Sequence, residues 1–439
     1  MPCFHVDKDA KITPHPASGK GHERADIHDR IDEIAKKLQP KVVEWRHDIH
    51  KNPELSNREF RTAKIVADHL KSLKLDSVKT DIAPTGVVGI LKGGKPGNKV
   101  IALRADMDAL PVEEKADVPF KSTVIDKDYP DGPFPVAHVC GHDAHTTMLM
   151  GAAEVLAELR DEIPGTVMFV FQPAEEGPPL GEPFGAEAML KAGIFDDPKP
   201  DACFCMHTTT LPVNTLAYGD PTMTAASTLF TIKIQGKQVH GSMPWLGLDT
   251  MPVLAAITNG FAQIYRQVPA TDAVTLSIGK VDTVGRSNIV GDHTVVQGTM
   301  RAVKDDIMEN IEKRMARIVE HAAAMHGLTA TIEFEQQVPS SVNTKDWIEK
   351  LTPSLERVAG PGNLHVVPPM MAYDDASRFV QAAGGMYICI GVQDVKFGPH
   401  GIEGNMVPNH NEKYYVLDES MELGVRTHAY VTMDFLGAN

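Results

Sequence analysis

Two short segments of the sequence concentrate side chains that can bind metal ions or transfer protons. Cys140 and His142 stand two residues apart in HVCGHDAH, and a sulfur together with an imidazole can bind a borderline metal such as zinc or manganese. Glu175 and Glu176 are adjacent in QPAEEG, so extended backbone points their side chains to different sides. One carboxylate can then bind metal while the other transfers protons.

Two histidines complete the candidate set, because His207 follows the apolar run CFCM and His410 lies in VPNHNEKYY. Singly, Cys140 also fits a small buried hydrophobe, adjacent glutamates fit a solvated surface pair, and each histidine fits a core or surface position. A two-metal hydrolase needs such a group of residues, since its metals polarise a carbonyl and acidify bound water while a nearby carboxylate accepts a proton. The candidate ligands are Cys140, His142, Glu176, His207 and His410, and Glu175 is the remaining carboxylate.

The candidate residues follow apolar runs that predict buried strands. The runs 86–92 and 99–103, separated by GGKPGN, predict a hairpin whose second strand ends at RADMD. The run 166–171 leads to QPAEEG, and the run 201–206 ends just before His207. Enzymes of the α/β class place their sites at the carboxyl edge of the sheet, so we expect one shared site there.

The order of the predicted elements divides the 439-residue chain into two domains after a mobile tail over residues 1–30. Residues 31–218 and 338–439 predict an α/β catalytic domain with a mixed sheet. Residues 219–337 predict an inserted βαββαβ domain with two layers.

Composition excludes several classes of protein. The chain has 43 basic and 58 acidic residues, a net charge of -15, which argues against nucleic acid and anionic membranes as partners. No stretch reaches the roughly 20 apolar residues of a membrane span, and no signal peptide is visible at the start. We therefore expect a cytoplasmic protein, with export after removal of a signal peptide as the alternative. Five cysteines are too few for a disulfide framework in a chain of this length.

Six segments resemble, in their order, the amidohydrolase branch of peptidase family M20, which includes hippurate hydrolases, N-acyl-amino-acid hydrolases and auxin-conjugate hydrolases. These segments are LRADMDALP, HVCGHDAHTTMLMGAA, FQPAEEG, GKQVHGSMP, SNIVGDHTVVQGTMR and PNHNEKYY. The resemblance implies a catalytic domain interrupted by a lid domain through which the protein forms a homodimer or a higher homo-oligomer.

The resemblance also implies two divalent metal ions per subunit, Zn²⁺ or Mn²⁺ with Co²⁺ as a further candidate, on the five ligands named above. Glu175 matches the general base, and Asp108 matches the acid that orients a histidine ligand. Asp106 is expected to support the site without binding metal. His240 matches a lid histidine that stabilises the oxyanion in the partner's site, and Asn288 and Arg301 match lid residues that hold the substrate carbonyl or carboxylate.

These assignments imply a binuclear metal-dependent amidohydrolase that acts on linear amides, cleaving N-acyl amino acids or similar small amide conjugates. An M20-type dipeptidase or carboxypeptidase for short peptides is the alternative, and an inactive metal- or ligand-binding homologue is a remote one. The chain departs from its relatives at Tyr373-Asp374-Asp375-Ala376, after His207 and after His410, which leaves the acyl preference open. Asp374 or Asp375 would favour the peptidase if either contacted a free amine.

Overall fold

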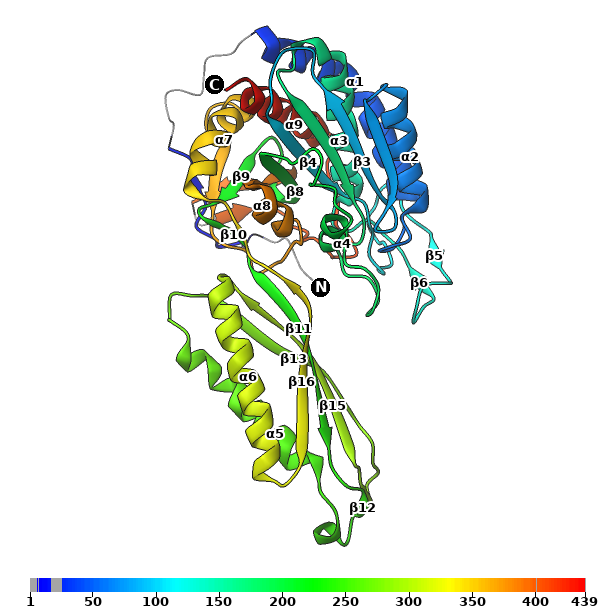
Figure 1. Ribbon diagram of the computed structural model, residues 1–439, viewed down its shortest axis with the longest axis vertical. Coiled ribbons are helices and arrows are strands. Elements are labelled where there is room, and N and C mark those ends of the chain that lie inside the picture. The colour runs from blue at the N-terminus through cyan, green and yellow to red at the C-terminus, as the bar shows by residue number, and fades with distance from the viewer. Residues whose placement is uncertain (1–5, 7, 17–25, 400, 439) are drawn as a thin grey trace. The chain divides into compact units, whose positions relative to one another are not determined.

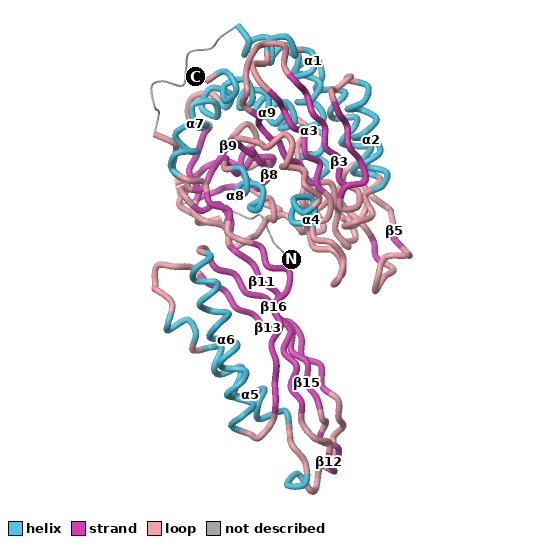
Figure 2. The backbone as a smooth tube through the Cα atoms, in the orientation of Figure 1, coloured by secondary structure: helices cyan, strands magenta, loops and turns pink. Residues whose placement is uncertain are grey.

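The computed structural model describes residues 6, 8–16, 26–399 and 401–438, and these divide into two compact units. The first unit comprises Met1–Met223 and Ser341–Asn439, and the second comprises Thr224–Ser340. Figures 1 and 2 show the helices and strands of each unit. The role of the second unit as a lid and dimerisation domain remains a prediction.

The first unit is built on a mixed sheet that has nine strands among the described residues, in the order β1-β18-β9-β19-β8-β4-β7-β3-β2. Strand β4 pairs in parallel with both β7 and β8, whereas β3 pairs with β7 in the antiparallel sense. In chain order the strands are β1 (Thr13–Pro14), β2 (Ser77–Ile82), β3 (Gly86–Lys92), β4 (Val100–Asp106), β7 (Thr166–Gln172), β8 (Ala202–Pro212), β9 (Leu216–Gly219), β18 (Leu364–Val367) and β19 (Gly385–Gln393). This confirms the predicted fold class, an α/β protein with a mixed sheet.

Helices pack around this sheet in two groups. In the first group, α9 packs on α1, α3 and α7, α1 packs on α3, and both α3 and α9 pack against β4. In the second group, α4 and α8 pack against each other, and α8 lies on β8 and β19. The helices of the unit are α1 (Asp26–Lys51), α2 (Phe60–Ser72), α3 (His142–Glu158), α4 (Gly185–Lys191), α7 (Lys345–Ala359), α8 (Ser377–Ala383) and α9 (Ser420–Gly437), with the 3-10 turn η1 (Arg160–Glu162). Short strand pairs complete the unit: β5 (Ile125–Asp126) with β6 (Phe134–Pro135), and β20 (Lys396–Gly398) with β21 (Gly401–Glu403).

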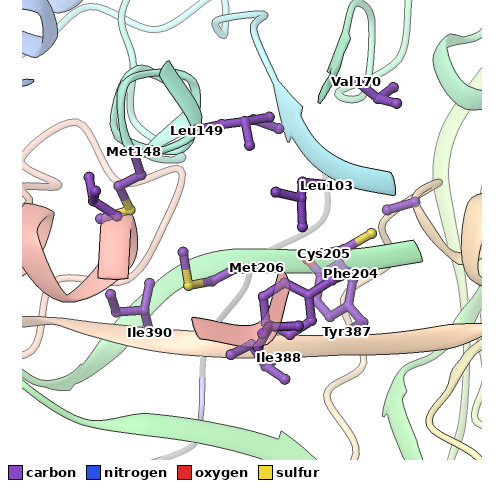
Figure 3. Packing of buried hydrophobic residues seen from close by; sticks show 14 of the residues in the cluster. Leu103, Met148, Leu149, Val170, Phe204, Cys205, Met206, Tyr387, Ile388 and Ile390 are labelled. Atoms are coloured by element: carbon purple, nitrogen blue, oxygen red, sulfur yellow. The ribbon is translucent and has the colours of Figure 1, made fainter. Parts of the chain in front are cut away.

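The hydrophobic core lies where β4, β8 and β19 meet helix α3. Leu103, Phe204 and Ile388 come from these three strands, and Met148 and Leu149 come from the helix (Figure 3). All five side chains are fully buried. Burying an aliphatic or aromatic side chain contributes about 1.5–3 kcal/mol, so this contact fixes the middle strands and thereby the sheet edge where they end.

The second unit has a four-stranded antiparallel sheet in the order β13-β15-β11-β16, with helices α5 and α6 packed on it. Its main elements are β11 (Ala226–Gln235), α5 (Thr250–Ala262), β13 (Val274–Thr283), β15 (His293–Ala302), α6 (Asp305–Met325) and β16 (Thr329–Val338). These follow the predicted order βαββαβ. Shorter elements are β12 (Val239–His240), η2 (Pro244–Leu246), η3 (Ile264–Gln267) and β14 (Ile289–Val290). Strands β10 (Thr222–Thr224) and β17 (Ser341–Val342) pair with each other near the two points in the sequence where the units are divided.

Two local predictions are wrong. Strands β3 and β4 do not form a hairpin, because β7 lies between them and pairs with both. His207 does not follow the end of its strand but lies within β8, which continues to Pro212. The apolar pattern ends at His207, so it does not reveal that the strand continues. The next residues are threonines, which are polar but are buried here and are well accommodated in a strand.

The segment predicted as a mobile tail, residues 1–30, is partly placed in the structure. Strand β1 pairs with β18, Val6 is buried, and helix α1 already begins at Asp26. Residues 1–5, 7 and 17–25 of the predicted tail lie outside the described residues. Among the residues that are described, no helix has both the length and the apolar character needed to cross a membrane.

Candidate active site

The candidate residues are positioned by the neighbouring strands β4, β7 and β8. Asp106 ends β4, Glu175 and Glu176 follow the end of β7, and His207 lies in β8. Because these strands run parallel, their carboxyl ends share one edge of the sheet. His142 is the first residue of α3, and α3 packs against β4 beside this edge.

Gly141 allows Cys140 and His142 to approach the same place. It adopts a left-handed conformation with φ of 93°, which favours glycine. A Cβ atom at this position would lie 2.1 Å from Thr208 Oγ1. That hydroxyl cannot readily move, because it donates to the carbonyl oxygen of Cys140 and accepts from Tyr414 Oη.

A first group of donors consists of Cys140, Glu176, His410 and His207. His410 Nε2 lies 3.2 Å from Cys140 Sγ and 3.0 Å from Glu176 Oε1. His207 Nε2 lies 3.5 Å from the same sulfur, while His207 Nδ1 is 2.7 Å from the carbonyl oxygen of Thr208. That carbonyl can only accept, so it fixes the proton on Nδ1 and leaves a lone pair on Nε2.

A second group forms around His142. His142 Nε2 lies 3.8 Å from Glu175 Oε2, 3.8 Å from Glu176 Oε1 and 3.7 Å from Asp106 Oδ2. Glu176 therefore lies within reach of both groups. The structure thus brings all five predicted ligands together, with the predicted base Glu175 beside them.

Several of these donor atoms lack the hydrogen bonds that buried polar atoms normally have. Glu175 is fully buried, yet neither of its carboxylate oxygens accepts a hydrogen bond from the described residues, and His142 Nε2 also makes none. Such atoms are costly in a protein interior unless a ligand or ion satisfies them. A thiol, three imidazoles and carboxylates are donors that suit zinc and comparable divalent metals, so the residues fit a metal centre.

The surroundings of two acid groups of the site, Glu175 and Cys140, favour their neutral forms. Burial raises the pKa of Glu175 well above its ordinary value, and the carboxylates of Asp374 and Glu176 add to that rise. Burial likewise raises the pKa of the Cys140 thiol, with Glu176 and Glu175 adding to the effect. Positive charge at this place would reverse both shifts, because it favours a carboxylate and a thiolate.

Asp108 holds His142 from behind. Its Oδ1 lies 3.3 Å from His142 Nδ1, and its Oδ2 accepts hydrogen bonds from Ser56 Oγ at 2.7 Å and from the amide of Glu176 at 3.0 Å. This geometry suits the predicted orienting role, because a carboxylate on Nδ1 leaves Nε2 free to bind metal. Ser56 was not predicted.

His145 lies in the same cluster but its ring is fully engaged. Its Nδ1 is 2.6 Å from Asp106 Oδ1, and its Nε2 accepts a hydrogen bond from the amide of Thr208 at 2.8 Å. Asp106 also lies 2.7 Å from Arg104 Nη1. Asp106 and His145 also lie close enough to His142 and His207 to share an ion with them, so the purely supporting role of Asp106 stays a prediction.

Asp374 and Asp375 form a buried network close to Glu175, and the suggestion that either contacts a free amine stays a prediction. Both are fully buried. Arg104 Nη1 and Nη2 donate to the two oxygens of Asp374 at 3.0 and 2.9 Å, and Gln172 Nε2 donates to Asp375 Oδ1 at 2.6 Å. Sequence reasoning missed this network, although an arginine inside the apolar run VIALRAD signalled a buried ion pair.

The predicted lid residues all lie in the second unit. His240 and Asn288 are exposed neighbours, because β12 pairs with β14 and the amide of Gly241 donates to the Asn288 carbonyl oxygen at 2.8 Å. His240 Nδ1 is 2.8 Å from Ser242 Oγ. Arg301 is buried in β15 and donates to Ser227 Oγ and, at 2.8 Å, to Thr299 Oγ1. Their contact with substrate remains a prediction.

Comparisons with known proteins identify related hydrolases. Residues 102–434 match the family model for Peptidase family M20/M25/M40. The chain is 33% identical over 413 residues to thermostable carboxypeptidase 2 of Saccharolobus solfataricus, covering 93% of this chain and 99% of the relative. It is 32% identical over 403 residues to IAA-amino acid hydrolase ILR1-like 4 of Arabidopsis thaliana, covering 90% and 86%. Among solved structures, it is similar to the Bacillus subtilis YXEP protein, described as a dinuclear metal binding peptidase from the M20 family, with a TM-score of 0.74, 26% identity and coverage of 92% and 100%.

Proposed function

The chain belongs to peptidase family M20/M25/M40 and is therefore a hydrolase, and on this premise we propose that it cleaves the amide bond of N-acyl amino acids or similar small amide conjugates. One observation carries the proposal. Five donors from four separate segments converge beside Glu175, a buried carboxylate that accepts no hydrogen bond from the described residues.

The residues that would hold two divalent metal ions are Cys140, His142, Glu176, His207 and His410. Glu176 would be available to a metal in either donor group, since its Oε1 lies 3.0 Å from His410 Nε2 and 3.8 Å from His142 Nε2. When bound, the metals supply Lewis-acid polarisation of the scissile carbonyl and lower the pKa of the attacking water. Zn²⁺ and Mn²⁺ suit these donors, and Co²⁺ is the further candidate.

Glu175 carries the proton transfers. Its carboxylate accepts a proton from the water that attacks the amide carbonyl, and the resulting acid then protonates the leaving nitrogen. Asp108 keeps His142 in the orientation that metal binding requires.

Residues of the second unit would complete the site in a homodimer. His240 would donate to the oxyanion in the partner's site, and Asn288 and Arg301 would bind the carbonyl and the carboxylate of the substrate. Arg301 Nη1 donates to Ser227 and Thr299, and these hydrogen bonds hold the guanidinium in its present position.

A peptidase that acts on short peptides is the second candidate, favoured by the 33% identity to a carboxypeptidase. Asp374 and Asp375 lie close to Glu175, so contact of either with a free amine would support a dipeptidase, whereas a carboxypeptidase does not need that contact. The test is release of free amino acid from a panel of N-acyl amino acids and dipeptides, with chelated protein reloaded with Zn²⁺, Mn²⁺ or Co²⁺. Metal-dependent cleavage of acyl amino acids supports the proposal, cleavage of peptides alone replaces it with the peptidase, and no cleavage with any metal contradicts both.

A further inference from the structure

We propose that Glu59 is a positioning residue, whose carboxylate fixes the backbone on which Glu175 stands. The inference rests on the proposed function, since it concerns the residue assigned there as the base. Glu59 lies at the amino end of α2 and is fully buried, and it belongs to neither the ligand set nor the groups that contact it directly.

Three segments converge on the Glu59 carboxylate. Its Oε1 accepts hydrogen bonds from the amides of Asn57 at 3.0 Å and Ala174 at 2.9 Å. Its Oε2 accepts from Thr85 Oγ1 at 2.5 Å. One side chain therefore joins the turn before α2, the loop after β7 and the residue before β3.

The two amides held by Glu59 belong to residues with unusual backbone conformations. Asn57 has φ of 62° and Ala174 has φ of 50°, both in the left-handed region. An L-residue such as alanine adopts this conformation only where its surroundings enforce it. The hydrogen bond from the Ala174 amide to Glu59 is such a restraint.

Both held residues stand directly beside the site. Ala174 precedes Glu175, so its backbone angles set the direction in which the base leaves the chain. Asn57 follows Ser56, whose hydroxyl donates to Asp108 Oδ2, the same oxygen that accepts from the Glu176 amide. Loss of the Glu59 contacts should therefore displace Glu175 first and loosen Asp108 second.

What Glu59 supplies is acceptor geometry and not charge. Two of its three partners are backbone amides, which a neutral carbonyl oxygen can satisfy equally well. Burial, with Asp108 adding to it, raises the pKa of Glu59 to about 8, so its ionised form is not favoured by its surroundings. Glu59→Gln keeps an acceptor oxygen for both amides and presents an NH₂ group to Thr85 Oγ1, whereas Glu59→Ala removes every contact.

The experiment compares kcat, KM and metal content for the metal-loaded wild type and for Glu59→Gln, Glu59→Ala and the control Glu54→Ala. Glu54 is the matched carboxylate, because it also holds backbone amides at the start of α2, those of Arg61 and Thr62, but its side chain contacts no part of the site. We expect Glu59→Ala to lower kcat about 100-fold with KM and metal content within roughly threefold of wild type, since a displacement near 1 Å costs about that much. Glu59→Gln should keep kcat within about fivefold, and Glu54→Ala should lower stability but leave kcat unchanged.

A second variant tests the backbone restraint itself. Glycine adopts positive φ without strain, so Ala174→Gly added to Glu59→Ala should raise kcat about tenfold above that of Glu59→Ala alone. If the inference is wrong, Glu59→Ala keeps wild-type kcat, or Glu59→Gln is as inactive as Glu59→Ala.

If Glu59→Ala does not fold, the Glu59→Gln result decides, because the inference requires that variant to be active. Absence of turnover in the wild type contradicts the proposed function instead, and the position of Ala174 in a crystal structure of Glu59→Gln and Glu59→Ala then tests the restraint without activity.

Discussion

Replacing His50 with Gln tests whether a buried, charged histidine ties α1 to the start of α3. His50 Nδ1 lies 2.9 Å from Asp143 Oδ2, and its Nε2 lies 2.9 Å from Glu114 Oε1. Burial lowers the pKa of His50, but the charge of Asp143 and the hydrogen bonds to Asp143 and Glu114 outweigh burial and raise the pKa to about 9. Arg46 opposes that rise, and the His138 ring also faces His50, with 6.2 Å between the ring centroids.

The direction of the pH effect follows from the higher pKa in the folded state. The ordinary pKa is 6.5, so charged His50 contributes stability that is fully present below pH 6.5 and is lost as the pH rises through about 9. This difference in pKa corresponds to roughly 3 kcal/mol. Gln cannot be protonated, so the stability advantage of the wild type over His50→Gln should shrink by about that amount between about pH 6 and pH 10.

Urea denaturation of both proteins, loaded with the same metal and followed across this pH range, measures the effect. Contributions from titrating groups distant from His50 cancel in the difference of the two free energies of unfolding, and the pKa of Asp143, which contacts His50, lies well below this pH range. An advantage that does not change with pH would refute the argument, because it would show that His50 acts by packing or by neutral hydrogen bonds.

Three further changes probe the site and its support. Asp108→Asn removes the carboxylate that orients His142 and should lower metal affinity about 10–100-fold in competition with a chelator, whereas unchanged affinity would remove Asp108 from that role. Gly141→Ala should lower the free energy of unfolding by roughly 2 kcal/mol or more, and with it the melting temperature, because its Cβ would meet Thr208 at 2.1 Å. A wild-type melting curve would contradict this. Phe204→Ala should lower the free energy of unfolding, measured by denaturant titration, by about 3–5 kcal/mol. A decrease below about 1 kcal/mol would mean that the core relaxes around the cavity.

Much of the site could be predicted because its ligands stand at strand ends and helix starts that apolar runs reveal. Glu176 follows such a run, whereas Cys140 and His142 stand at the start of a helix after a loop, and the structure brings them together with His207 and His410. The family and the α/β fold with a mixed sheet are confirmed. Local patterns were sufficient there, because hydrophobic periodicity and strand order act over short stretches.

Features that depend on distant contacts could not be predicted. The turn GGKPGN suggests a hairpin, yet β7 inserts between β3 and β4, a pairing that no local pattern encodes. Asp374 lies 270 residues from Arg104 in sequence, so its burial against that arginine was invisible before the fold was known. Glu59 escaped notice for the same reason, since its partner Ala174 is 115 residues away.

The central claim is that Glu175 acts as the base beside metals held by its neighbours, and Glu175→Gln tests it most directly. Turnover of an N-acyl amino acid and metal content should be measured together on wild type and variant reloaded with the same metal. We expect the variant to lose kcat by about 10²-fold or more with metal content equal to wild type, because Gln preserves the shape but cannot accept the proton. Hydrolysis at the wild-type rate by the metal-loaded variant would contradict the account.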